Sequence, residues 1–78
     1  MDKDKKKEIR ELARAYVPLV PGKYGAVTQL AKRYTKYLPE VSKVLKGTER
    51  VMNKLDYYKI RYDAIVEFGF CKRPTPMN

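Results

Sequence analysis

The chain has 78 residues and carries 18 Lys and Arg against 9 Asp and Glu, which gives a net charge of +9. This length indicates one small domain with a single modest core, and the positive charge favours a polyanionic partner. The chain has no His and a single Cys, so we expect no intramolecular disulfide, no zinc or iron–sulfur cofactor and no histidine general base. Nothing resembles a signal peptide or a membrane span, which favours a cytoplasmic protein.

The first expected helix covers about residues 3–16. Apolar residues recur on one face of this segment at the helical spacing i, i+3, i+4, i+7: Ile9, Leu12, Ala13 and Tyr16. Pro18 ends the helix, because the residue before a proline is pushed out of α geometry. A basic amphipathic helix also suits an anionic membrane surface, but the short stripe favours docking on the core, and we expect no membrane partner.

Two short helices are expected at about residues 26–34 and 38–46. Each carries its own apolar stripe, formed by Val27, Leu30, Ala31 and Tyr34 in the first and by Leu38, Val41, Val44 and Leu45 in the second. Pro39 suits the first turn of a helix and Gly47 suits its end. Because so few residues separate the two stripes, the segment predicts a helix-turn-helix.

This segment resembles the helix-turn-helix of lambda-repressor/Cro-type (XRE-type) DNA-binding proteins. The family pattern has a small residue in the first helix, a β-branched residue ten positions later, an apolar residue three further on and a closing Gly. Those places are held here by Ala31, Val41, Val44 and Gly47. The corner departs from the pattern, since Thr35 and Lys36 replace the usual Gly and hydrophobic residue. The resemblance implies an all-α, lambda-repressor-like domain of four or five helices.

The resemblance also implies that the second short helix enters the major groove of double-stranded DNA. The residues that would contact DNA are Leu38 and Lys43 at the bases, Tyr37 and Ser42 at a base or a phosphate, and Lys23, Thr28, Lys36, Lys46 and Arg50 at the backbone. Residues 21–50 carry a net charge of +5, which supports this placement. Leu38 and Pro39 form no bidentate hydrogen bonds with bases, so they either touch a thymine methyl group or, in the case of Leu38, close the core at the helix corner.

The last expected helix covers about residues 52–68 and ends at Gly69. Its apolar residues span a wide arc, and this surplus predicts a homodimer through Ile60, Phe68 and Phe70. The charged residues of this helix have the pattern of a solvated face with i, i+4 ion pairs: Asp56, Lys59, Arg61, Asp63 and Glu67. Residues 1–70 are expected to form the single domain and residues 71–78 a flexible tail.

The sequence therefore predicts a double-stranded DNA-binding protein, a small transcriptional regulator in the cytoplasm of a bacterium or a phage-infected host. The alternative is a helix-turn-helix scaffold that binds protein, as an adaptor or a virion-associated component. Seven tyrosines among many cations also suit single-stranded nucleic acid, but most of these tyrosines lie on apolar stripes. No phosphate loop, nucleophile elbow or metal box is found, so we expect neither an enzyme nor a small-molecule substrate.

Overall fold

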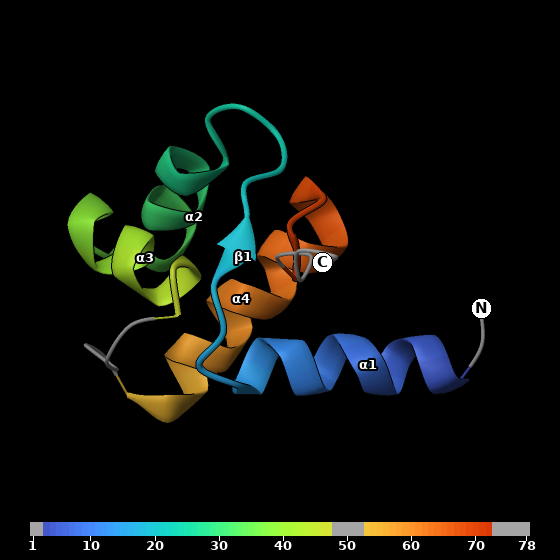
Figure 1. The fold of residues 1–78 in the computed structure, drawn as a ribbon. Coiled ribbons are helices and arrows are strands. Elements are labelled where there is room, and N and C mark those ends of the chain that lie inside the picture. The colour runs from blue at the N-terminus through green and yellow to red at the C-terminus, as the bar shows by residue number, and fades with distance from the viewer. Residues whose placement is uncertain (1–2, 48–52, 73–78) are drawn as a thin grey trace, which may run out of the picture.

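The computed structural model describes residues 3–47 and 53–72, and these residues are mostly helical (Figure 1). The described part of the chain contains four helices, α1 (Lys3–Arg14), α2 (Ala26–Tyr34), α3 (Leu38–Leu45) and α4 (Lys54–Phe68). Two short strands, β1 (Leu19–Val20) and β2 (Cys71–Lys72), pair in antiparallel fashion. The expected helical fold is confirmed at this level, while the small sheet was not predicted.

The longest helix, α4, lies at the centre of the fold and contacts each of the other three helices. Figure 1 shows α2 and α3 together at one end of the molecule, while the N-terminal part of α1 extends away from the other helices. The core lies where the helices meet, and its fully buried side chains are Leu30, Val41, Val44, Ile60 and Ala64. The position of α2 and α3 is therefore set by their packing on α4.

The apolar arc of α4 is used within the domain. Ile60, Phe68 and Phe70 are 0%, 7% and 4% exposed and belong to the core. The predicted dimer surface is therefore wrong in the residues it names, because α1 packs on one part of the arc and α2 and α3 pack on another. Leu55 and Val66 remain more than half exposed on α4.

The first helix is shorter than predicted. It ends at Arg14, and Tyr16 is 57% exposed, with its ring at an edge-on angle to the ring of Tyr57. The proline at position 18 disfavours α geometry at Val17, so Tyr16, the last residue of the predicted apolar stripe, lies outside the helix.

The segment after α4 differs from the prediction of a flexible tail. Gly69 ends the helix with a φ of 74°, and the next residues form β2, with Cys71 opposite Val20 and Lys72 opposite Leu19. The loop after β1 passes so close to this helix end that a side chain at Gly22 would lie 1.8 Å from the Phe68 carbonyl oxygen. Residues 73–78 lie outside the described residues.

A single buried cation joins three parts of the chain to α4. The Arg61 side chain is 0% exposed, although the sequence pattern placed it on a solvated face. Its Nε donates to the carbonyl oxygen of Ala13 at 3.1 Å, and Nη1 donates to that of Val44 at 2.8 Å. Its Nη2 donates to the carbonyl oxygens of Leu12 and Val17, each at 2.8 Å. The guanidinium therefore binds the C-terminal ends of α1 and α3 and the loop that follows α1.

Three of the four partners of Arg61 are carbonyl groups at helix ends. Leu12, Ala13 and Val44 lie in the last turns of α1 and α3, where carbonyls lack their usual i+4 partner and carry the negative end of the helix dipole, although the Val44 carbonyl also accepts the Gly47 N–H at 3.2 Å. Among the described residues no carboxylate lies within ion-pair distance of this guanidinium. Burial lowers the pKa of Arg61, and the nearby Tyr57 ring, 5.3 Å from the guanidinium, opposes that shift.

Replacement of Arg61 by Lys tests this arrangement. A single ammonium group cannot reach four separated carbonyl oxygens, and unsatisfied buried carbonyls cost about 1–3 kcal/mol each. We expect the free energy of unfolding to fall by about 3 kcal/mol or more in urea denaturation. The same substitution at exposed Arg10 is the control and should change it by less than about 0.5 kcal/mol. Equal urea midpoints for the wild type and Arg61→Lys would contradict this role of the guanidinium.

Candidate nucleic-acid interface

The corner between α2 and α3 consists of Thr35, Lys36 and Tyr37. Thr35 adopts a left-handed conformation with φ 54° and ψ 51°, which is unusual for a β-branched residue. Its N–H donates to the Lys32 carbonyl at 3.3 Å, and the N–H of Lys36 donates to the Ala31 carbonyl at 2.9 Å. The backbone thus makes the turn for which a Gly is better suited.

After this turn, Tyr37 is extended and α3 begins. The Tyr37 carbonyl accepts the N–H of Val41 at 3.1 Å, while Pro39 occupies the first turn, where its missing N–H costs nothing. Val41, Val44 and Leu45 are buried, and Ala31 of α2 is 7% exposed in the same core cluster. A small residue at a helix crossing allows the axes of α2 and α3 to approach closely. One side of α3 therefore packs on the core, and its opposite side faces solvent.

Ion pairs fasten the C-terminal end of α2 to α4. Arg33 contacts Glu67 through both Nη atoms, with Nη2 at 3.1 Å from Oε1, and its Nη1 lies 3.3 Å from Asp63. The Tyr34 hydroxyl donates to the same Asp63 carboxylate. The hydrogen bond from Arg33 lowers the pKa of Glu67 and, together with the weaker Asp63 contact, raises the pKa of Arg33.

A further pair joins the corner to the start of α4. The ammonium group of Lys36 lies 3.0 Å from the Asp56 carboxylate and lowers its pKa. The acidic residues of α4 were predicted to pair along their own helix. Asp56, Asp63 and Glu67 instead pair with residues of α2 and the corner, because that segment passes along the side of α4 on which they lie.

The predicted DNA contacts differ in their exposure. Tyr37 is 77% exposed and Leu38 is 48% exposed, so Leu38 does not close the core at the corner. Ser42 and Lys36 are partly buried, and Arg50 lies outside the described residues. The remaining predicted contacts are exposed: Lys23, Thr28, Lys43 and Lys46. Most of the predicted set is thus accessible, and Lys36 is partly neutralised by Asp56.

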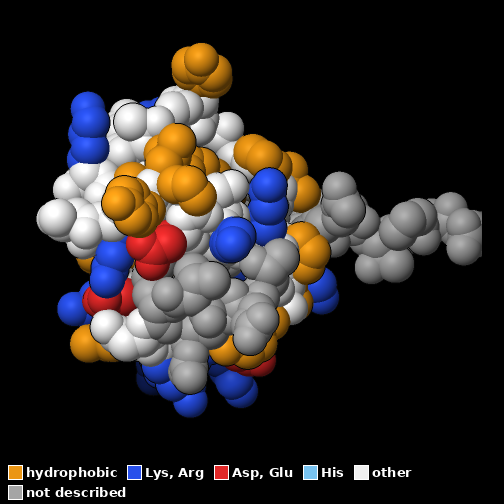
Figure 2. Space-filling model, turned by 90° about the vertical axis from the view of Figure 1, so that its left-hand side faces the viewer, with side chains coloured by type: hydrophobic (Ala, Val, Ile, Leu, Met, Phe, Trp, Pro, Cys, Tyr) orange, Lys and Arg blue, Asp and Glu red, His pale blue; other side chains and the backbone are white. Residues whose placement is uncertain are grey.

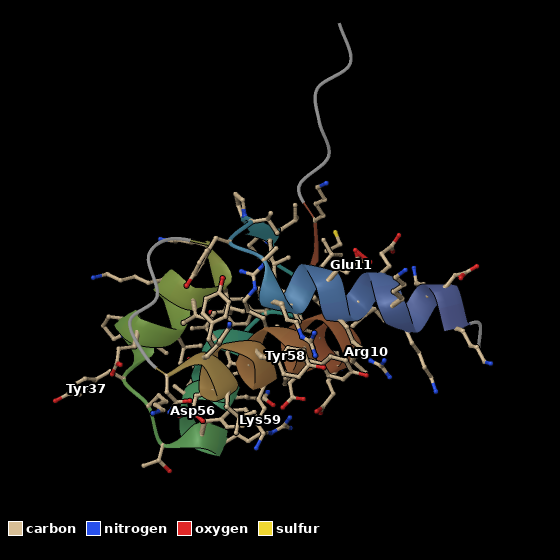
Figure 3. The ribbon with its side chains drawn as sticks, turned by 90° about the horizontal axis from the view of Figure 1, so that it is seen from below. Arg10, Glu11, Tyr37, Asp56, Tyr58 and Lys59 are labelled. Atoms are coloured by element: carbon tan, nitrogen blue, oxygen red, sulfur yellow. The ribbon has the colours of Figure 1, made fainter. Side chains whose placement is uncertain are left out.

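The exposed side of α2 and α3 combines apolar and cationic groups. Figure 2 shows this end of the molecule, where hydrophobic side chains gather and separate Lys and Arg side chains surround them, with acidic side chains nearby. Tyr37 extends away from the helices (Figure 3). Lys23, Lys32 and Lys46 have no ion-pair partner among residues 3–47 and 53–72. In the part of the chain that the structure describes, these three ammonium groups are therefore left without an ion pair on this surface.

The start of α2 adds backbone donors to this surface. Its N-cap is Gly25, with φ 80° and no side-chain hydrogen bond, and the Ala26 N–H donates to the Lys23 carbonyl at 3.3 Å, so the open amides of the first turn are those of Val27 and Thr28. Lys23 and Thr28 line a shallow hollow around this helix start, and the neighbouring Tyr24 is fully exposed. Open amides at a helix start favour an anion such as a phosphate oxygen.

Comparisons with protein-family models, curated proteins and solved structures found no match. Within the described residues no group of His, Cys, Asp and Glu side chains is arranged to hold a metal ion. None of the helices in that part of the chain is both long and apolar enough to cross a membrane. The binding partner is therefore inferred from the chemistry of the surface itself.

The Tyr34–Asp63 contact predicts a pH effect on stability. Burial and the hydrogen bond to Asp63 raise the pKa of Tyr34 to about 12, above its unfolded value of about 10. Because the pKa is raised on folding, the protonated Tyr34 hydroxyl contributes to the free energy of unfolding below about pH 10, and this contribution is lost as the pH rises toward about 12. Tyr34→Phe should cost about 0.5–1.5 kcal/mol at neutral pH, and the difference from the wild type should shrink over that alkaline range.

Urea denaturation at several pH values measures this difference. Tyr24→Phe is the matched control, because Tyr24 is fully exposed and its hydroxyl supports no packing. A constant difference between the wild type and Tyr34→Phe from pH 8 to about pH 12 would show that Tyr34 ionisation is not linked to folding.

Proposed function

We propose that this protein binds double-stranded DNA through a helix-turn-helix formed by α2 and α3, and that it acts as a small transcriptional regulator. In this proposal the domain is of the lambda-repressor-like kind and α3 is the recognition helix. The observation that carries the proposal is the two-sided character of α3: Val41, Val44 and Leu45 are buried, while Lys43 and Lys46 are exposed. A short helix held from behind with cations on its outer side suits the major groove.

The charges around α3 support the same partner. Lys46 lies at the C-terminal end of α3 and Lys23 lies beside the open start of α2. Both can neutralise phosphates, and Thr28 with the first amides of α2 can donate hydrogen bonds to phosphate oxygens. Lys36 joins this set only when it exchanges Asp56 for a phosphate. The DNA backbone would thus be held on both sides of the base-facing helix.

The alternative partner is a protein. Exposed Tyr37 and Leu38 supply an apolar contact of the type found at the centre of protein interfaces. The net charge of +5 on residues 21–50 favours DNA over that partner, unless the partner protein is itself strongly acidic.

DNA binding predicts a steep salt dependence. If Lys23, Lys43 and Lys46 each neutralise one phosphate, log K should fall with log salt at a slope of about −2.7. Titration of a fluorescent duplex at salt concentrations from about 50 to 200 mM measures this slope. A single strand of the same sequence is the control and should bind more weakly, since it lacks a major groove. The proposal fails if no duplex binds at the lowest salt.

Lys43 within α3 and Lys46 at its C-cap should have different effects on binding. Lys46→Ala should weaken binding to all duplexes alike and reduce the salt slope by about 0.9, because a phosphate contact carries no sequence information. Lys43→Ala should also relax the preference at one base pair, by about 1–3 kcal/mol. Selection from a random duplex library with each variant measures both effects. Identical selected sequences for Lys43→Ala and the wild type would remove Lys43 from the base-reading residues.

A further inference from the structure

The first turn of α3 presents an apolar surface to solvent. Leu38 is 48% exposed, the neighbouring Tyr37 is 77% exposed, and Pro39 is exposed as well. Neither Leu38 nor Pro39 has a side-chain hydrogen-bonding group, and Pro39 also lacks a backbone N–H. The first turn also carries the partly buried Glu40, and the polar side chains Ser42 and Lys43 come one turn after Leu38.

The position of these apolar groups is fixed by the fold. Leu38 is the first residue of α3, and the helix is held by buried Val41 four residues from its N-cap and by Val44 beyond it. The Tyr37 carbonyl is tied to the Val41 N–H. The exposed part of the Leu38 side chain therefore projects from a backbone that the fold holds in place. A side chain that makes a defined contact with a ligand needs such a fixed backbone.

The edges of DNA bases offer one apolar group in the major groove. Every base presents hydrogen-bond donors or acceptors there, and only thymine adds a methyl group at C5. An apolar side chain placed against a polar edge leaves that edge without its water partners, which costs free energy. An apolar side chain placed against the thymine methyl removes apolar surface from water and stabilises the complex.

We propose that the first turn of α3 selects its DNA by thymine methyl groups, and that Leu38 is the specificity-determining residue. The target then contains a T·A base pair where the start of α3 meets the major groove, followed by the base pair that Lys43 contacts. In this proposal Tyr37, which lies beside Leu38, donates a hydrogen bond from its hydroxyl to the DNA backbone at the same base-pair step. This inference rests on the proposed DNA binding and names which feature of the duplex is recognised.

Replacement of thymine by uracil tests the inference, because it removes the methyl group and leaves every hydrogen-bonding group in place. A preferred duplex is first selected from a random library, and each thymine of that duplex is then replaced singly by deoxyuridine. Burial of one methyl group contributes about 0.8 kcal/mol, so one replacement should weaken wild-type binding about fourfold. The other replacements should change the affinity little.

Variants assign the effect to Leu38. With Leu38→Ala, the thymine and uracil duplexes should bind with equal affinity, because the side chain that contacts the methyl group is gone. Lys46→Ala is the matched control and should weaken both duplexes while keeping the fourfold ratio between them. Circular dichroism should show that both variants fold, as expected for residues with exposed side chains.

The outcomes separate this inference from the proposed function. Sequence-dependent duplex binding that no uracil replacement weakens would overturn the reading of thymine methyl groups and leave DNA binding intact. A uracil effect that persists in Leu38→Ala would overturn the role of Leu38. Absence of any duplex binding would overturn the proposed function, and the inference would fall with it.

Discussion

The fold depends on the guanidinium of Arg61, which is buried without a carboxylate partner among residues 3–47 and 53–72. An isolated buried cation is costly, and Arg61 is tolerated because four carbonyl oxygens from three segments surround it. Two of these segments are helix ends, whose dipoles place partial negative charge at the guanidinium. A domain of this size has few large side chains with which to fill a core. Arg61 fills core volume and also makes directional hydrogen bonds, which fix where the C-terminal ends of α1 and α3 lie against α4.

Local sequence patterns predicted the helices well and their partners poorly. The bounds of α2 agree with the prediction, because the apolar stripe of residues 26–34 is clear, and α3 follows from Pro39 and its own stripe. Arg61 was misplaced because it was considered with the charged residues of α4. It also lies on the stripe of Tyr57, Ala64 and Phe68, at helical spacing, and that position was the available signal.

The acidic residues of α4 show a second limit of sequence patterns. Spacing along one helix indicates which residues can pair within it, but it does not indicate which other segment passes alongside. Asp63 and Glu67 bind Arg33, and the apolar arc of α4 meets three helices, because the packing brings these segments together. The candidate site was predicted only in part: the apolar stripe correctly placed Val41 and Val44 in the core, but it also included Leu38, which is 48% exposed because the first turn of the helix lies at the edge of the packing. The ion pair between Lys36 and Asp56 could not be predicted, because spacing along α4 does not indicate which segment passes beside it.

These ion pairs divide the positive charge of the domain into two parts. Arg33 and Lys36 fasten α2 and the corner to α4, so they stabilise the fold and contribute less to attraction of phosphates. The cations left at the outer surface are fewer than the net charge suggests, and non-specific affinity scales with the number of phosphates neutralised. A domain with few phosphate contacts depends more on its base contacts for stable binding. In the proposed complex with DNA, Leu38 and Pro39 in the first turn of α3 would supply such a contact without further positive charge, and discrimination between sequences would then be a larger share of the total binding free energy.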